Sequence, residues 1–313
     1  MGTFRGAAAV LTIVTCGLFA ASADAAIPLC DGAGAPQTLY SDQGTLESVI
    51  VGNAGRLYFS STPAGNPTSS QLLRIEKPGA TPTLVTEAPP GPGGLAWDGR
   101  NLLWGYGNSA ANGAVGDLTP KAGLNRVNPV TGKKTLLSST LGMANGVAKA
   151  PDGTMFASND FGQKLDRISS KGVTTNGWAT VNKANGLAVS RNGKYLYANS
   201  ILSNPPTVYR VEIANPSNVI PYAVAPADQG ISILDGLTRD DKGNLYVAVW
   251  GKGQVWKINS KQQICVLASG MTQTSSLYLG RGKKGFKAGN LFVVGFDGKI
   301  IKVPGAYAAT YPG

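Results

Sequence analysis

Four oxygen-bearing side chains occupy the same position in a sequence phrase that returns along the chain. The phrase starts with a polar residue and a glycine, continues as a short apolar run, and resumes that run after a glycine-containing turn. It starts at Asn145-Gly146, Asn185-Gly186 and Asp235-Gly236, and Glu47 fills the same slot in an earlier copy. A unit repeated at this spacing sets the architecture of a chain. We therefore expect these four side chains to lie at equivalent places in a repetitive fold.

Two carboxylates and two carboxamides suit a hard divalent cation. Such a cation takes several oxygen ligands, and two negative charges balance Ca²⁺. Because the set contains no nitrogen or sulfur donor, calcium is favoured over a transition metal, although another hard divalent cation would fit. The chain has no histidine and only three cysteines. This composition excludes Ser-His-Asp and Cys-His catalysis, HExxH zinc sites and soft-metal sites.

The alternative is that Asn-Gly and Asp-Gly simply form turns, as they do in many hairpins. We adopt that interpretation for four residues in or beside glycine-containing turns: Asp98, Asp152, Asn192 and Asp297. Glu47 has no turn-forming role, and uncompensated carboxylates in a narrow channel would be costly. The sequence therefore favours metal binding by Glu47, Asn145, Asn185 and Asp235.

Short β-strands must position these side chains. Glycine is abundant, with 42 residues, charge is low, and no stretch shows a sustained helical period. Six units can be aligned on the residue that precedes the first strand of each, which we call the phase residue. The phase residues are Glu47, Gly93, Asn145, Asn185, Asp235 and Ser275. Their spacings of 46, 52, 40, 50 and 40 residues are typical of four-stranded propeller blades. The sequence therefore predicts an all-β fold, a six-bladed β-propeller. In such a ring the phase residues would face the central channel at one end.

The sixth unit lacks its outer strand, because the chain ends soon after the third strand, residues 299–303. Residues 37–40 have the Thr-Leu form of the other fourth strands. We therefore expect the N-terminal segment to complete the last blade and close the ring, which removes an exposed sheet edge. Residues 26–313 would then form a single propeller domain.

Residues 1–25 resemble a secretory signal, with Arg5, an apolar centre over residues 6–20, and a small-residue cleavage site at Ala23-Asp24-Ala25. A membrane anchor would need about 18 clean apolar residues, and this run is shorter. No later segment could span a bilayer. We predict a secreted or periplasmic protein with no membrane attachment after cleavage.

Cys30 and Cys265 are the cysteines that remain after cleavage. A leftover pair in an oxidising compartment usually bonds, and this bridge would attach the N-terminal segment to the outer edge of blade five. The alternative is two buried thiols. The net charge of +11 comes from scattered residues, and the only dense cluster is at residues 283–287. Since no nucleic-acid motif accompanies it, we interpret the charge as surface solvation with mild attraction for anions, and expect no nucleic-acid partner.

These motifs resemble the senescence-marker-protein/gluconolactonase/luciferin-regenerating-enzyme-like family, within the calcium-dependent phosphotriesterase superfamily. The resemblance covers most of the mature chain. It rests on Glu47, on Asn145-Gly146 with Pro151-Asp152-Gly153, on Asn185-Gly186, on Asp235-Gly236-Leu237 and on residues 245–251. It implies a six-bladed propeller whose divalent cation activates hydrolysis of lactones or esters. The residues matching Glu47, Asn185 and Asp235 bind the metal in that family, and the one matching Asn145 binds metal or substrate.

Two departures from the family pattern bear on the substrate. Sugar-lactonase members have an Arg two residues before the third-blade Asn and an Asp after it, where this chain has Met143 and Gly146. The histidines of paraoxonase and phosphotriesterase relatives are also absent. An apolar lactone or ester therefore fits this sequence better than a sugar acid.

The hypothesis is that calcium polarises the carbonyl group and stabilises the oxyanion. Asp235, or alternatively Glu47, takes a proton from the attacking water, while Asn145 and Asn185 orient the substrate. The ends of the second strands return to the same face, so four further residues are candidates for binding substrate, unless they are ordinary loop or packing residues: Tyr106, Asn159, Asn199 and Trp250. Two other functions remain open, because such rings also serve pure recognition. They are a non-catalytic binding propeller with a structural calcium site, and a strictosidine-synthase-like propeller without the metal set.

Overall fold

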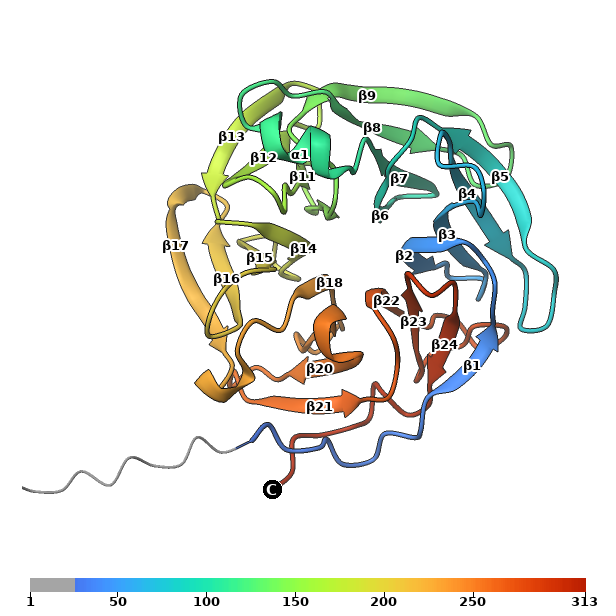
Figure 1. Cartoon of the computed structure of the whole chain (residues 1–313), viewed down its shortest axis with the longest axis vertical. Coiled ribbons are helices and arrows are strands. Elements are labelled where there is room, and N and C mark those ends of the chain that lie inside the picture. The colour runs from blue at the N-terminus through green and yellow to red at the C-terminus, as the bar shows by residue number, and fades with distance from the viewer. Residues whose placement is uncertain (1–25) are drawn as a thin grey trace, which may run out of the picture.

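The chain folds into six small antiparallel sheets that surround a common centre, the hub (Figure 1). The computed structural model describes residues 26–313, so the proposed signal sequence lies outside the described residues. Each sheet has four strands. The six-bladed propeller predicted from the repeats is therefore confirmed.

Blades one to three follow one another in the chain, each running from its innermost strand outwards. Blade one comprises β2 (Thr45–Val51), β3 (Leu57–Thr62), β4 (Ser70–Ile75) and β5 (Thr83–Ala88). Blade two comprises β6 (Pro92–Asp98), β7 (Asn101–Tyr106), β8 (Ala122–Val127) and β9 (Lys134–Leu141). Blade three comprises β10 (Val147–Lys149), β11 (Met155–Ala157), β12 (Lys164–Ile168) and β13 (Thr174–Thr180).

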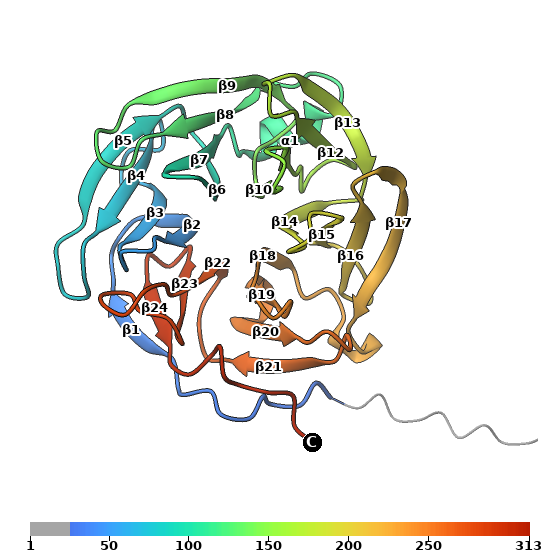
Figure 2. The ribbon, with the colours of Figure 1, turned by 180° about the vertical axis from the view of Figure 1, so that it is seen from behind.

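Blades four to six continue the pattern, and the inner strands of all six surround the hub (Figure 2). Blade four comprises β14 (Ala184–Val189), β15 (Tyr195–Ser200), β16 (Thr207–Glu212) and β17 (Asn215–Val224). Blade five comprises β18 (Leu234–Arg239), β19 (Leu245–Val249), β20 (Gln254–Ile258) and β21 (Ile264–Ala268). Blade six comprises β22 (Thr274–Leu279), β23 (Leu291–Gly295), β24 (Ile300–Val303) and, from the other end of the chain, β1 (Gln37–Tyr40).

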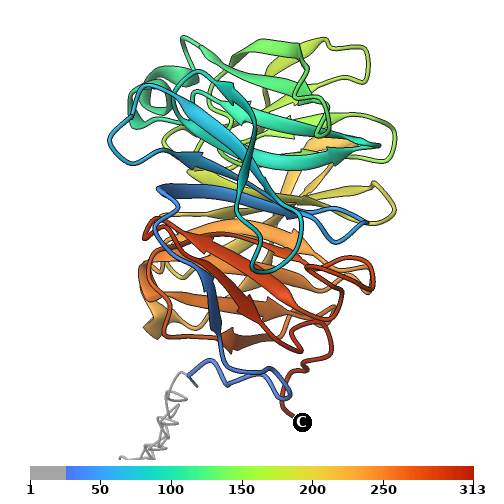
Figure 3. The same ribbon diagram turned by 90° about the vertical axis from the view of Figure 1, so that its right-hand side faces the viewer.

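Closure by the N-terminal strand is confirmed. β1 pairs antiparallel with β24, with Gln37 opposite Lys302. Figure 3 shows this blue strand beside the red C-terminal strands, with the two terminal segments running together below the ring. Pairing with β1 leaves β24 without an open edge.

The predicted disulfide is also present. Cys30 and Cys265 are bonded, with 5.1 Å between their Cα atoms. Beside the bond, the Cys30 N–H donates to the carbonyl of Val266, and the Val266 N–H donates to Pro28. The segment before β1 is thereby attached to β21, the outer strand of blade five, as expected.

The hydrophobic core lies between neighbouring blades. Ile50 and Tyr58 of blade one pack with Leu95 and Trp104 of blade two in one buried cluster, and the other interfaces repeat this arrangement. Full burial of a large apolar side chain contributes about 1.5–3 kcal/mol. Such packing on both faces of every blade holds the inner strands in place around the hub.

One helix was not expected. α1 (Ala110–Gly116) lies in the loop between β7 and β8, and Ser109 caps it by accepting a hydrogen bond from the Asn112 N–H. Seven residues are too few to show a helical period in the sequence. Two single-turn 3₁₀ helices, η1 (Ala227–Gln229) and η2 (Trp250–Lys252), complete the elements. No helix among residues 26–313 is long and apolar enough to cross a membrane.

Candidate metal centre

Five of the six phase residues lie on a repeated β-bulge within the inner strand, not before it. We predicted that each would precede its strand, and this was wrong in five blades. In blade one, Leu46 pairs with Ser61 and Ser48 with Ser60, so Glu47 is an extra residue in β2. The inner strands of blades two, four, five and six carry the same irregularity at the phase position. Only Asn145 precedes its strand. A bulge changes the direction of a side chain next to a site, which a repeat pattern alone does not indicate.

The glycine after each polar phase residue allows the next blade to come close. A Cβ atom on Gly146 would lie 2.2 Å from the carbonyl oxygen of Asn185. One on Gly186 would lie 2.4 Å from that of Asp235, and one on Gly236 would lie 2.7 Å from that of Ser275. None of these three glycines has a positive φ. The Asn-Gly and Asp-Gly pairs are therefore not turn formers here, because their glycines bring the phase residues of adjacent blades into contact.

Backbone strain recurs two residues before the phase position. Lys183, Ile233 and Gln273 have φ angles of 54°, 53° and 47°, and Gly91 is the equivalent in blade two. A β-branched residue such as Ile233 is an outlier in this region, and such strain gathers at functional sites. The strained residues fix how the chain enters the hub.

Side chains from the second strands hold the phase residues from behind. Ser158 of blade three donates to the carbonyl of Asn185 and accepts from the Gly146 N–H. Asn199 of blade four donates to the carbonyl of Asp235 and accepts from the Gly186 N–H. Each clamp joins two blades, so the positions of the phase residues depend on one another.

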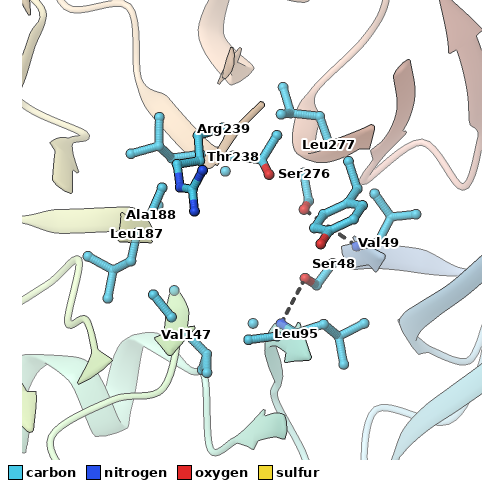
Figure 4. A pocket seen from close by; sticks show the side chains of 18 of the residues that line it. Ser48, Val49, Leu95, Val147, Leu187, Ala188, Thr238, Arg239, Ser276 and Leu277 are labelled. Carbon is cyan, nitrogen blue, oxygen red and sulfur yellow. Dashed lines mark hydrogen bonds between the residues drawn. The ribbon is translucent and has the colours of Figure 1, made fainter. Parts of the chain in front are cut away.

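The structure brings the four predicted ligands together in one cavity. Glu47, Asn145, Asn185 and Asp235 all line a cavity of about 500 Å³ in the central channel. Asn145, Asn185 and Asp235 are buried, and Glu47 is half-buried. Figure 4 shows the cavity walls, with side chains from several inner strands facing the same space.

Burial makes the carboxylates at this end of the cavity hard to ionise. Loss of solvation raises the pKa of Glu47 from its ordinary 4.5 to about 8, with a further contribution from the charge of Asp160, and the Asn108 amide offsets this in part. Burial also raises the pKa of Asp235 well above its usual range, followed by repulsion from Glu47 and Asp160, while the Asn185 amide lowers it in part. A bound cation would reverse these effects by stabilising the charged forms.

Asp160 is a member of this cluster that the sequence analysis missed. It follows β11, is 8% exposed, and accepts a hydrogen bond of 3.4 Å from the Asn185 side chain. Burial raises its pKa to about 6. Its second oxygen, Oδ1, is buried without a hydrogen-bond partner among the described residues. The feature of the sequence that indicates this place is the return of the second-strand ends to this face of the ring. That feature led to the prediction for Asn159, the residue before Asp160.

These residues fit a hard divalent cation. Across residues 26–313, no three Asp, Glu, Cys or His side chains are grouped closely enough to hold a metal by themselves. A site here would therefore combine the carboxylates of Glu47 and Asp235 with amide oxygens of Asn185 and Asn145. The unpartnered Asp160 oxygen supports this, because a buried carboxylate oxygen without a donor is expensive. Oxygen-only ligands of mixed charge are what calcium accepts.

Asn145, which was also predicted to bind substrate, lines this cavity, but the other four predicted substrate-binding residues do not: Tyr106, Asn159, Asn199 and Trp250. Asn159 holds α1 in place, donating to the Gly113 carbonyl at 2.9 Å and to Asp117 at 3.0 Å. Asn199 is the clamp described above, Tyr106 ends β7, and Trp250 packs edge-on against Phe296. A role for them in substrate binding remains a prediction.

Three of the four residues interpreted as turn formers stabilise a turn through their side chains. Asp152, Asn192 and Asp297 each accept a hydrogen bond from the backbone N–H two residues further on. This is the Asx-turn arrangement. Asp98 instead forms ion pairs with Arg126 at 2.5 Å and Lys149 at 3.1 Å.

Comparison with known proteins agrees with the fold. A family model described as "SMP-30/Gluconolactonase/LRE-like region" matches residues 157–294. The chain is thus a six-bladed propeller that resembles this family from blade three to blade six, which confirms the resemblance read from the motifs. No curated protein sequence matches this chain.

Solved structures of similar architecture include a calcium-binding regucalcin from Agrobacterium tumefaciens, with 16% identity, a TM-score of 0.64, and coverage of 92% of this chain and 97% of that one. A gluconolactonase from Xanthomonas campestris has 17% identity and a TM-score of 0.64, over 91% and 99% of the two chains. A luciferin-regenerating enzyme has 14% identity and a TM-score of 0.64, over 90% and 98%. At these identities the likeness shows a shared fold.

Proposed function

We propose that the protein is a calcium-dependent hydrolase of lactones or esters. The observation that carries this proposal is the convergence of Glu47, Asn145, Asn185 and Asp235 in one cavity. The buried, unpartnered oxygen of Asp160 beside them adds to the case. The gluconolactonase-like resemblance supplies the reaction class.

Glu47, Asn185 and Asp235 would hold the cation, with Asn145 as a further metal or substrate ligand. When bound, a divalent cation there polarises a carbonyl group and stabilises negative charge that develops on its oxygen. Asp235 is the proposed general base for the attacking water, and Glu47 is the alternative. Asn199 and Ser158 act as positioning residues, because they fix the backbone of the phase residues.

The substrate is proposed to be apolar. Met143, in place of the family arginine, is 2% exposed. Met143 itself offers no charged partner for a sugar acid.

We also propose that the protein is exported to the periplasm or the medium as a single propeller domain. The disulfide between Cys30 and Cys265 supports this, because such bonds persist in oxidising compartments.

A second candidate function is recognition without catalysis, with the calcium acting structurally. The clamps that tie the phase residues to neighbouring blades favour it, since a cation at the hub would also hold the blades together. A strictosidine-synthase-like propeller is the third candidate and would retain no calcium.

The test is metal analysis of the purified mature protein with a panel of lactones and esters. Asp235→Asn keeps the side-chain shape and removes the base. Asp152→Asn is the matched control, because an asparagine preserves the Asx turn. We expect calcium-dependent turnover that falls at least a hundredfold in Asp235→Asn and stays unchanged in Asp152→Asn. Calcium binding without turnover would support recognition, and equal turnover in Asp235→Asn and wild type would refute the proposed chemistry.

A further inference from the structure

A group of arginines lies at the other end of the central cavity. The cavity wall continues along the inner strands to Arg239, at the end of β18, and to Arg191 and Arg281. Arg239 is four residues beyond Asp235 in the same strand, about 13 Å away for an extended chain. One cavity therefore has carboxylates at one end and guanidinium groups at the other.

These arginines have no carboxylate partner among the described residues. The ion pairs of residues 26–313 involve other cations. Arg239 donates to the carbonyls of Val189 and Asp240, and Arg191 donates to that of Asp241. Arg281 donates to the hydroxyl of Tyr278 at 2.7 Å and to Asn53 at 3.2 Å.

Two carboxylates line the same end of the cavity, but both have other partners. Asp240 accepts hydrogen bonds from Asn244 and from Tyr246. Asp241 accepts from the hydroxyl of Tyr307 at 2.7 Å. Lys149, the fourth cation in the wall, is paired with Asp98. Asp240 and Asp241 keep their negative charges, so three guanidinium groups and two carboxylates leave this end of the cavity with a small net positive charge.

Arg239 is the residue placed best to bind an anion. It is half-buried, and Figure 4 shows its side chain pointing into the cavity between Ala188 and Thr238. Burial disfavours the charged form of Arg239 and lowers its pKa. A bound anion would offset this loss of solvation. Arg239, Tyr278 and Arg281 also line a second cavity of about 510 Å³, so these groups lie at the junction of two spaces.

We infer that this end of the channel binds a small organic carboxylate. A planar guanidinium group matches a carboxylate in geometry. A cavity of about 500 Å³ is large enough for such a ligand. The site does not depend on the metal centre, and it would remain if the proposed hydrolase activity were wrong.

The test is isothermal titration of the mature protein with octanoate, in the presence of a chelator and again with calcium. We expect saturable binding of one octanoate per chain, weakened about tenfold or more in Arg239→Gln and in Arg281→Gln. Arg100→Gln, an exposed arginine outside both cavities, is the matched control and should bind as wild type does. Asp235→Asn should also retain binding, which separates this site from the metal centre.

Arg281→Gln provides the test if loss of the Arg239 hydrogen bonds prevents folding. Octanol should bind at least tenfold more weakly than octanoate if the carboxylate is recognised. The inference is overturned if wild type does not bind octanoate, or if Arg281→Gln binds it as well as wild type. Inorganic phosphate that binds more tightly than octanoate would also overturn it, since the site would then prefer a compact, hydrated anion to a carboxylate.

Discussion

Replacement of Glu47 by glutamine should stabilise the metal-free protein and weaken its response to calcium. Glutamine has nearly the same shape but no charge. The pKa of Glu47 rises from 4.5 to about 8 in the metal-free site, mainly through burial and then through the charge of Asp160. At about 1.4 kcal/mol per pKa unit, accommodation of this carboxyl group at pH 7 costs up to about 3 kcal/mol.

The sign of the pH dependence follows from that shift. Because the folded-state pKa is raised, the folded protein binds more protons than the unfolded chain between about pH 4.5 and pH 8. The metal-free wild type should therefore lose stability as the pH rises through this window, and Glu47→Gln should lose less. Asp160 and Asp235 contribute in the same direction, since their pKa values are also raised by burial.

The assay is urea unfolding with a chelator at pH 5, 7 and 8.5, repeated with saturating calcium. We expect the two proteins to be similar at pH 5, and the variant to be more stable by about 3–5 kcal/mol at pH 8.5 without calcium. With calcium the order should reverse, because the variant has lost a charged ligand. Asp152→Asn is the control. Equal stability of Glu47→Gln and wild type at pH 8.5, with equal gains from calcium, would refute the reasoning.

Three further predictions follow from the same features. Cys265→Ser should lower the free energy of unfolding by up to about 5 kcal/mol, because the bond closes a loop of 235 residues, and a wild-type melting temperature unaffected by reductant would contradict this. Calcium binding at pH 7 should release protons, since Glu47 is mostly protonated in the metal-free site. Calorimetric titrations in buffers of different ionisation enthalpy measure this proton release. Binding heats that do not depend on the buffer would contradict the prediction. Gly186→Ala should cost about 1–3 kcal/mol and weaken calcium binding, because its Cβ would meet the Asp235 carbonyl oxygen at 2.4 Å; an alanine variant with wild-type stability and affinity would show that the blades have room to move.

Features written into the repeat could be predicted from the sequence. The blade number came from the spacing of the phase residues, closure came from the Thr-Leu form of β1, and the bridge came from two remaining cysteines. The meeting of Glu47 with Asp235 followed from equivalence within a ring, although the two are far apart in the chain.

Features that depend on local register or on loops could not be predicted. Asp160 lies in a loop after β11, outside the repeated phrase, so its closeness to Asn185 depends on how that loop folds. The bulge at Glu47 leaves no mark in the pattern of apolar residues. The glycine of Asn185-Gly186 was weighed as a turn residue, and its use for close approach to Asp235 depends on a neighbouring blade. Arginine is common on protein surfaces, so the sequence gives no sign that Arg239 and Arg281 belong to a site. They line the same channel only because the blades close into a ring.

The central claim is most directly tested by a crystal structure of the mature protein grown with calcium. One ion per chain is predicted at the hub, with oxygens of Glu47, Asn185 and Asp235 at about 2.3–2.6 Å from it, the usual range for calcium. An ion bound elsewhere, or no ion at the hub under saturating calcium, would contradict the claim.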